Sequence, residues 1–258
     1  MHTWHWHNWE GLPYLTCNLL GLWPHGFFTQ QFWPRPPQEL TKVLQPQAAA
    51  YRLKQVHGNT VLTPQEVDEH LNHSDDELAL ADGLISEQPL QAVWVASADC
   101  TPVLIGDVKI GQVAALHAGW RGTAAKIVPE AIQRMQSQGS KLQDLRIAMG
   151  PAIAGQVYQV SLEVAAKIGS TIIPHHDDKK IVAALHNLPD SPLLPDTEPG
   201  KVRLDVRRIN ALQLQQLGIN VEQIAIAPYC TYQTPEHFFS YRREKEKKVQ
   251  WSGIVSLS

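Results

Sequence analysis

Short apolar runs recur along the chain, and each is rich in β-branched residues and bounded by Gly, Pro, Asp or Asn. Such runs are typical of β-strands with turns at their ends. The predicted strands cover residues 49–56, 59–63, 91–98, 101–106, 109–117, 145–150 and 222–228. Near the N-terminus, Trp4 and Trp6 alternate with His5 and His7, which is the period of two expected of a strand at the edge of a sheet.

A second pattern, with apolar residues three and four positions apart, predicts three helices that each bury one face. In chain order they occupy 124–135, with Gly139 as the stop; 161–169, with Ser161 as N-cap; and 204–218, with Gly218 after the last turn. Asp, Ser and Gly at these ends are the residues that helix termini favour.

Mixed strands and helices, with several strands that are apolar throughout, imply a sheet covered on at least one face by helices. We therefore expect a layered α/β or α+β fold with a mixed β-sheet and flanking helices. The stretch 188–200 contains four prolines and predicts a surface loop. Because the segments on either side of it are each incomplete as a core, residues 1–258 are expected to form one domain. The mixed-charge run 242–248 predicts a solvated hairpin tip.

Composition excludes several kinds of partner. With 22 basic and 25 acidic residues the net charge is −3, which argues against nucleic acid and anionic membranes and favours a small-molecule or protein partner. The three cysteines lack the dense spacing of a disulfide scaffold, which favours a reducing compartment. The N-terminus has no secretory-signal pattern, and no apolar run approaches the roughly 18 residues of a membrane span. We expect a cytoplasmic protein.

Three predicted strand ends or turns carry a soft metal ligand: His57, Cys100 and His117. Gly58 and Gly119 follow two of them and allow the backbone to turn sharply and approach a ligand. Two imidazoles and a thiolate, with no fourth partner, are the ligand count of a catalytic zinc that keeps one position open. The alternative is that these are ordinary buried residues, and since their spacing matches no local zinc motif, both interpretations stay open at this point.

Eight motifs in a fixed order give the chain a specific resemblance. The segments KQVHGNTV, ADGLIS, SADCTPVLI, LHAGWRGT, GPAI, YQV, LDVRRIN and CTY…FFSYRRE closely resemble the laccase-domain family, also called polyphenol-oxidase-like or YfiH-like, over roughly residues 50–245. Members of that family are regarded as purine nucleoside phosphorylases with adenosine deaminase activity. The resemblance implies a single mixed α/β catalytic domain of the CNF/YfiH-like kind. It also implies a pocket metal, zinc or alternatively copper, held by His57, Cys100 and His117.

The chain departs from the family pattern in three places. The segment 26–44 replaces the usual Gly-Asn-Leu, Gly-Asp and Asn-Arg run, so substrate contacts from that region are expected to differ. Gln156 and Val157 stand where paired cysteines often follow GPAI, and KVQWSG replaces the usual TGR after FFSYRR. None of these changes removes a predicted ligand.

Residues near the predicted ligands have two interpretations each. Asp99 should point away from Cys100 along a strand, which favours a turn role over metal binding. Asp82 is either a turn residue or an acid–base group that meets substrate. Arg121, predicted to lie just before a helix start, either contacts phosphate or pairs with a carboxylate. Tyr158 and Phe239 either flank a purine ring or pack in the core.

The resemblance makes a metal-dependent enzyme the leading hypothesis, with phosphorolysis of adenosine, inosine, guanosine or methylthioadenosine and deamination of adenosine as its reactions. The substrates would be purine nucleosides and phosphate. One alternative is a metal-free cysteine hydrolase with Cys100 as nucleophile and His117 or His57 as base. A copper-dependent polyphenol oxidase, suggested by the older family name, is disfavoured because His5 and His7 are the sole His-x-His pair. A binding or regulatory protein with a vestigial site is the third class.

Overall fold

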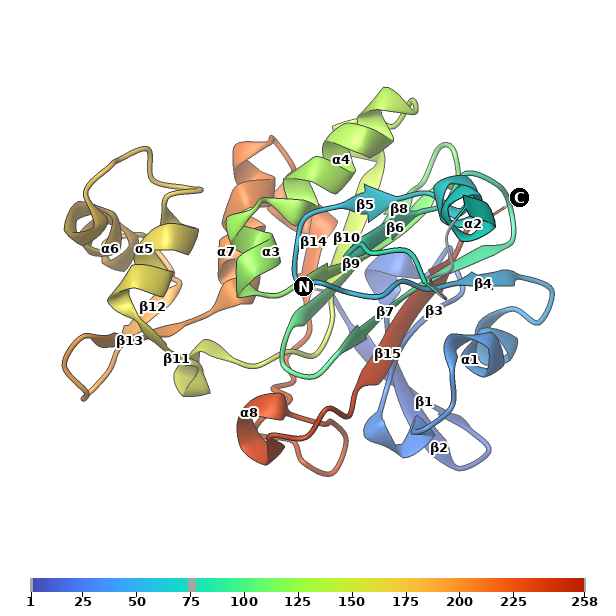
Figure 1. The fold of residues 1–258 in the computed structure, drawn as a ribbon, viewed down its shortest axis with the longest axis horizontal. Coiled ribbons are helices and arrows are strands. Elements are labelled where there is room, and N and C mark those ends of the chain that lie inside the picture. Colours follow the sequence, from blue (N-terminus) through green and yellow to red (C-terminus); the bar gives the residue numbers. More distant parts are fainter. Residues whose placement is uncertain (1, 74–77, 258) are drawn as a thin grey trace.

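Three β-sheets form the frame of the protein in the computed structural model, which describes residues 2–73 and 78–257 (Figure 1). The first sheet has six strands, antiparallel except for the pair β4–β7. Its strand order is β1 (Trp4–Trp9), β2 (Leu12–Cys17), β3 (His25–Phe28), β15 (Gln250–Val255), β7 (Gln91–Ser97) and β4 (Ala49–Tyr51). The predicted N-terminal strand is thus confirmed as an edge strand.

The second sheet also has six strands and carries the segments predicted to hold the chemistry. Its strand order is β14 (Ile224–Ile226), β10 (Leu145–Met149), β8 (Thr101–Asp107), β9 (Val113–Ala118), β6 (Gly83–Ile85) and β5 (Val61–Leu62). The outer pairs β10–β14 and β5–β6 are parallel, whereas the central strands are antiparallel. The sheet is therefore mixed, as predicted.

A small unit stands at one end of the molecule, on the left in Figure 1. It contains the three-stranded sheet of β11 (Gln159–Ser161), β13 (Lys201–Leu204) and β12 (Leu193–Pro195), with α5 (Leu162–Gly169) and α6 (Asp178–His186). The other helices are α1 (Pro37–Leu44), α2 (Pro64–His73), α3 (Trp120–Ala124), α4 (Ile127–Ser137), α7 (Val206–Gln216) and α8 (Tyr241–Glu244).

The two large sheets pack face to face. Phe27 and Val93 of the first sheet share one buried apolar cluster with Leu104 and Ala115 of the second. On the outer face of the second sheet, α4 and α7 bury their apolar sides, and α1 covers the outer face of the first sheet. The result is a helix–sheet–sheet–helix arrangement, which confirms the layered α/β prediction and adds a second large sheet to it.

Several predicted boundaries are wrong for identifiable reasons. The strand predicted at 109–117 starts at Val113, because the carboxylate of Asp107 accepts the N–H groups of Lys109 and Ile110 and Gly111 has a φ of 71° in the hairpin turn. The helix predicted at 124–135 is two helices, α3 and α4, separated by Lys126 in a left-handed conformation. The predicted cap at Ser161 is confirmed, since its hydroxyl accepts the N–H of Val164.

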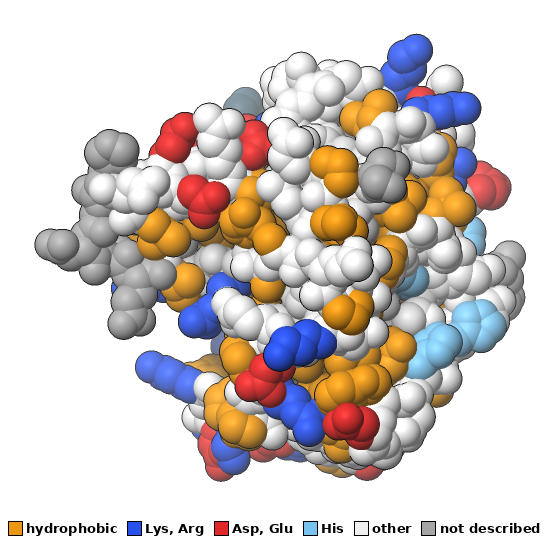
Figure 2. Space-filling view, turned by 90° about the vertical axis from the view of Figure 1, so that its right-hand side faces the viewer, with side chains coloured by type: hydrophobic (Ala, Val, Ile, Leu, Met, Phe, Trp, Pro, Cys, Tyr) orange, Lys and Arg blue, Asp and Glu red, His pale blue; other side chains and the backbone are white. Residues whose placement is uncertain are grey.

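Two segments that were predicted to be irregular contain regular secondary structure. The proline-rich stretch 188–200 contributes strand β12, which pairs with β13. The run 242–248 is not a hairpin tip, because it starts within helix α8 and its first two arginines are partly buried. Among the described residues, none of the helices has the length and apolar character that a bilayer span requires. On the face that carries α1 and α2, basic, acidic and apolar side chains are mixed (Figure 2).

Candidate active site

The ends of two neighbouring strands bring Cys100 and His117 together. Strands β8 and β9 are antiparallel, with Thr101 opposite Ala118 and Pro102 opposite His117. Cys100 immediately precedes β8, so its thiol lies beside the last residues of β9. The hydrophobic pattern predicted both strands, and their pairing supplies the proximity.

His57 reaches the same point from the loop that follows β4. The ligand atoms of His57, Cys100 and His117 all lie within 4.8 Å of one another. The two imidazole rings meet edge to face, with 4.9 Å between their centroids. His57 is exposed, Cys100 is partly buried and His117 is buried. The structure thus brings the three residues together as expected from the sequence, while their role as metal ligands stays a prediction.

A buried carboxylate organises the loop that carries His57. Asp82 accepts the backbone N–H groups of Val56, His57 and Gly58 at 3.1, 2.9 and 2.7 Å. These bonds hold His57 at a φ of 63°, in the left-handed region that residues other than glycine seldom adopt. The strained turn directs the imidazole toward His117.

The same carboxylate orients His117. Oδ1 of Asp82 accepts a hydrogen bond from Nδ1 of His117 at 2.9 Å, which leaves Nε2 to face Cys100. Burial raises the pKa of Asp82, but the hydrogen bonds from His117 and the loop outweigh it and hold that pKa below its usual value. Asp82 has no exposed surface, so the expectation that it meets substrate directly is wrong. It is a positioning residue.

Cys100 and His117 form a charged pair. Burial by itself would raise the pKa of the Cys100 thiol, but the imidazoles of His117 and His57 outweigh burial and lower that pKa below its ordinary value. In His117 burial lowers the imidazole pKa, but Cys100 and Asp82 outweigh it and raise that pKa. The two imidazoles thus favour the thiolate form of Cys100, the form that binds metals and acts as a nucleophile.

Two glycines permit the close packing of the site. A Cβ atom at Gly119 would lie 2.6 Å from the sulfur of Cys100. A Cβ atom at Gly122 would lie 2.9 Å from the carbonyl oxygen of Gly58, where α3 meets the His57 loop. The glycines of the HAGWRG segment are thus required by steric contact with the other two segments of the site.

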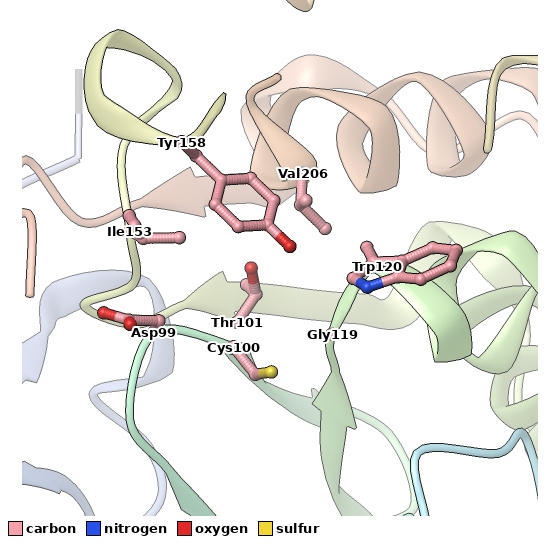
Figure 3. A pocket seen from close by; sticks show the side chains of 8 residues that line it. All are labelled: Asp99, Cys100, Thr101, Gly119, Trp120, Ile153, Tyr158 and Val206. Carbon is pink, nitrogen blue, oxygen red and sulfur yellow. The ribbon is translucent and has the colours of Figure 1, made fainter. Parts of the chain in front are cut away.

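A small pocket of about 30 Å³ opens beside Cys100 (Figure 3). It is lined by Asp99, Cys100, Thr101, Gly119, Trp120, Ile153, Tyr158 and Val206. The side chain of Tyr158 extends into it above Thr101 and Cys100. Phe239 is outside this lining: its ring packs edge to face on Trp33 at 6.0 Å, and its N–H bonds Gln250. The structure therefore does not bring Phe239 into the pocket with Tyr158.

Arg121 lies next to the pocket on an exposed face of α3. Its guanidinium stacks over the ring of Trp120, 4.4 Å from the centroid. The expectation that a helix begins just after Arg121 is wrong, because α3 begins at Trp120 and has five residues. The glycine at position 119 supplies the extended residue before the helix, one turn earlier than the apolar pattern indicated.

Asp99 has the turn role that the sequence favoured. It adopts a φ of 90°, and its carboxylate accepts the hydroxyl of Thr231 at 2.6 Å and the N–H of Arg242 at 2.7 Å. It is not part of the His57, Cys100 and His117 group. Asp99 therefore ties the C-terminal segment to the start of the strand that follows Cys100.

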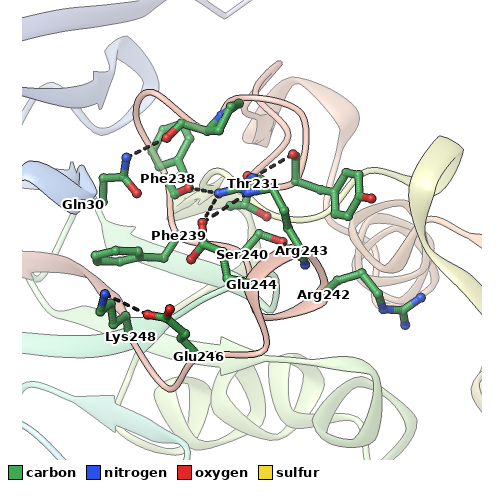
Figure 4. A network of polar contacts seen from close by, with 12 residues as sticks. Gln30, Thr231, Phe238, Phe239, Ser240, Arg242, Arg243, Glu244, Glu246 and Lys248 are labelled. Atoms are coloured by element: carbon green, nitrogen blue, oxygen red, sulfur yellow. Dashed lines mark hydrogen bonds and ion pairs between the residues drawn. The ribbon is translucent and has the colours of Figure 1, made fainter.

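Arg242 and Arg243 were overlooked in the sequence because they belong to a run of mixed charge. The guanidinium of Arg243 donates to the carbonyls of Thr231, Tyr232 and Phe238, each at 2.7 Å, and pairs with Glu244 (Figure 4). The one sequence signal for these roles was the FFSYRRE motif itself. Charge content alone indicates a solvated segment.

The donor set fits a zinc ion. Imidazole nitrogens and a thiolate are preferred zinc ligands, and three protein ligands leave one position for water or substrate. The hydrogen bond from His117 to a carboxylate is the arrangement that orients metal-ligating histidines. His57, Cys100 and His117 could therefore hold a metal beside the pocket that Cys100 lines.

Comparisons with known proteins agree with this architecture. A purine nucleoside phosphorylase of Synechocystis sp. is 54% identical over 256 residues, covering 98% of this chain and 97% of the relative. The purine nucleoside phosphorylase YlmD of Bacillus subtilis is 28% identical, and the match covers 79% of this chain and 69% of that relative. The crystal structure of YlmD from Geobacillus stearothermophilus has a TM-score of 0.80 at 23% identity, covering 98% of this chain and 99% of that one.

The family match covers most of the chain. Residues 37–257 match the family model described as multi-copper polyphenol oxidoreductase laccase. These residues include the His57 loop, the Cys100 and His117 strands and the C-terminal segment bound to Asp99. The chain belongs to this laccase-like family.

Proposed function

We propose that the chain is a zinc-dependent purine nucleoside phosphorylase that also deaminates adenosine. The observation that carries the proposal is the convergence of His57, Cys100 and His117, of which Cys100 lines a pocket. The name of the relative at 54% identity supports the phosphorylase activity. The substrates we propose are adenosine, inosine, guanosine and methylthioadenosine, each with phosphate.

The side chains of the site have distinct tasks in this proposal. His57, Cys100 and His117 would hold zinc, which would supply a Lewis acid and lower the pKa of a bound water toward neutral. Asp82 keeps the proton of His117 on Nδ1 and thus keeps Nε2 directed at the site. Trp120 and Tyr158 give the pocket aromatic walls that exclude water from the reacting bond.

Tyr158 is a hydrogen-bond donor in this site. Burial and the nearby charge of Cys100 raise the pKa of Tyr158 to about 12, so its hydroxyl keeps its proton at neutral pH. A protonated hydroxyl directed into the pocket can donate to an oxygen of phosphate or ribose. At about 30 Å³ the pocket is far smaller than the roughly 300–1,000 Å³ typical of ligand pockets, so a bound nucleoside would extend toward solvent.

The same proposal includes a cytoplasmic location and no nucleic-acid or membrane partner. The balanced net charge of −3 supports the absence of such partners, because nucleic acid and anionic lipid select basic surfaces. The three free cysteines support a reducing compartment.

A metal-free cysteine hydrolase is the second candidate, and one observation favours it. Asp82, His117 and Cys100 stand in the order acid, base and nucleophile, which also suits covalent catalysis. In that enzyme the metal-free protein would be fully active, and alkylating reagents would react with the thiolate of Cys100. A bound metal would instead protect the thiolate from these reagents. A copper oxidase is less well supported, because His5 and His7 lie on the edge strand of the other sheet.

Elemental analysis combined with a nucleoside screen tests the proposal. Purified protein is expected to contain zinc near one ion per chain and to release free base from nucleosides when phosphate is present. Inosine formation from adenosine is expected without phosphate. Metal-free active protein with an alkylatable Cys100 would favour the hydrolase, and copper-stoichiometric phenol oxidation would favour the oxidase.

A further inference from the structure

Two arginines border the pocket, each stacked on an aromatic ring of its wall. The guanidinium of Arg121 lies 4.4 Å from the ring centroid of Trp120, and that of Arg242 lies 4.7 Å from the ring centroid of Tyr158. Both rings line the pocket beside Cys100. Arg121 comes from α3 and Arg242 from α8, so the two guanidinium groups stack on pocket-lining rings from different elements.

Arg242 is held in place by the residues of the site. The backbone N–H of Arg242 donates to Oδ2 of Asp99 at 2.7 Å, and Asp99 directly precedes Cys100. Its guanidinium donates through Nη1 to the carbonyl of Gln159 at 3.0 Å, in the strand that follows Tyr158. The side chain points away from the network around Arg243 (Figure 4). Arg242 is therefore oriented by both walls of the pocket.

The charges of these arginines are not neutralised within the part of the chain that the structure describes. Arg134, Arg203 and Arg207 each pair with a carboxylate there, whereas neither Arg121 nor Arg242 forms an ion pair in it. A buried or stacked guanidinium without a carboxylate is poised to bind an external anion.

Asp99 is the carboxylate that lines the pocket. Both of its oxygens already accept hydrogen bonds, from the hydroxyl of Thr231 and the N–H of Arg242. Neither of these bonds comes from a guanidinium, so within the described residues Asp99 does not pair with the side chain of Arg121 or Arg242.

Both positive charges act on one atom inside the pocket. Burial is the main cause that raises the pKa of Tyr158, and the charges of Cys100 and Asp99 add to it, while Arg242 and Arg121 oppose them. The Tyr158 hydroxyl thus lies within the field of both guanidinium groups. An anion placed beside this hydroxyl would meet two cations and one neutral donor, which must outweigh the negative charges of Cys100 and Asp99.

We propose that Arg242 is a phosphate-binding residue that, together with Arg121, holds the phosphate dianion at the mouth of the pocket, with the Tyr158 hydroxyl between them. The planar fork of each guanidinium matches two oxygens of a phosphate, and stacking on Trp120 and Tyr158 fixes the orientation of both forks. This inference rests on the proposed function, because phosphate is the co-substrate there.

The test is a phosphate titration of base release from inosine by the zinc-loaded protein. Arg242→Gln is expected to raise the KM for phosphate by roughly tenfold or more, because charge-assisted hydrogen bonds to the dianion are lost. The KM for inosine is expected to stay within about twofold, since the nucleoside does not use this fork. Arg242→Lys keeps the charge and is expected to give a smaller increase.

Arg35→Gln is the matched control, because Arg35 also stacks on aromatic rings, those of Trp9 and Phe32, away from the pocket. It is expected to behave like the wild type. If Arg242→Gln does not fold, as judged by thermal unfolding, Arg242→Lys carries the test. Calorimetric titration of the same proteins with inorganic phosphate provides a readout without turnover.

Two results would overturn the inference. A KM for phosphate within twofold of the wild type in both Arg242 variants would show that Arg242 does not bind phosphate and only holds Gln159 in place. The proposed function would not be affected by that result. Wild-type protein whose base release does not depend on phosphate would contradict the proposed function and the inference with it.

Discussion

Oδ1 of Asp82 lies 2.9 Å from Nδ1 of His117, and the two side chains are 0% and 4% exposed. The same oxygen accepts the N–H of His57 at 2.9 Å. One buried atom thus fixes both imidazoles of the candidate metal site. It orients the ring of His117 directly and that of His57 through the backbone.

Replacing Asp82 by Asn is expected to weaken zinc binding by roughly 10- to 100-fold, the range typical of residues that orient metal ligands. The amide keeps the shape of the carboxylate but presents an NH2 group to donors. Competition with a chromogenic chelator measures the zinc affinity.

Asp107→Asn is the matched control for this variant. Asp107 is also buried and also accepts backbone N–H groups, but in the turn between β8 and β9 at their other end. It should bind zinc like the wild type. An Asp82→Asn protein with unaltered zinc affinity would show that the carboxylate does not position the ligands.

Gly119→Ala tests the steric part of the site. The added methyl carbon would lie 2.6 Å from the sulfur of Cys100, so the thiolate must move. A displacement of this kind is expected to reduce turnover by roughly a hundredfold. Gly58→Ala is the control, because its methyl would make an ordinary contact at 3.7 Å with Asp82. Equal activities of the two variants would contradict the claim that the close approach of Gly119 to Cys100 is needed for turnover.

Arg121→Lys separates the two proposed reactions. Lysine keeps the charge but loses the guanidinium fork, so phosphate-dependent release of adenine from adenosine should fall by roughly tenfold. Deamination to inosine uses water and should change less, and the zinc content should not change. Both products are measured in one phosphate titration, with Arg35→Lys as control. An equal loss of adenine and inosine formation would remove Arg121 from the phosphate site.

His25 predicts how stability depends on pH. Its Nε2 accepts the N–H of Cys17 at 2.9 Å and its Nδ1 donates to the carbonyl of Trp23 at 2.8 Å, so the folded protein holds a neutral ring. Burial lowers the pKa of His25 from 6.5 to about 4. The unfolded chain therefore takes up this proton first. The stabilisation is complete above about pH 6.5 and is lost as the pH falls toward 4.

Urea unfolding at several pH values measures this effect. The shift of the His25 pKa corresponds to about 3 kcal/mol of unfolding free energy at most, because one pKa unit is worth 1.36 kcal/mol. His25→Gln cannot take up the proton and should lose less stability than the wild type between pH 7 and pH 4. Parallel curves for the two proteins would rule out His25 as the cause.

The sequence predicted the strands of the site well because they are buried. The strands beside Cys100 and His117 are buried throughout and mostly apolar, and their pairing is the short hairpin β8–β9. The position of His57 was predicted by its motif, and the loop depends on hydrogen bonds to Asp82 from 24 to 26 residues away. Periodicity carries no information about such distant bonds.

The sequence was least informative where polar residues have long-range partners. Asp82 was indistinguishable from a turn residue or an acid–base group until its four donors were known. Arg242 was hidden in a charged run, although its backbone bonds Asp99 across 143 positions. Phe239 shared the motif with Arg242 yet packs on Trp33 instead. Apolar spacing reports burial and leaves the partners of polar groups open.

The central claim is that His57, Cys100 and His117 hold one zinc ion required for nucleoside cleavage. The most direct measurement determines zinc content and phosphate-dependent base release together for the wild type and for His57→Ala, Cys100→Ala and His117→Ala. Cys230→Ala serves as control, since that cysteine is outside the ligand group. We expect about one zinc per chain and full activity in the wild type and control, and loss of both in each ligand variant. Full zinc occupancy and turnover in any one ligand variant would contradict it.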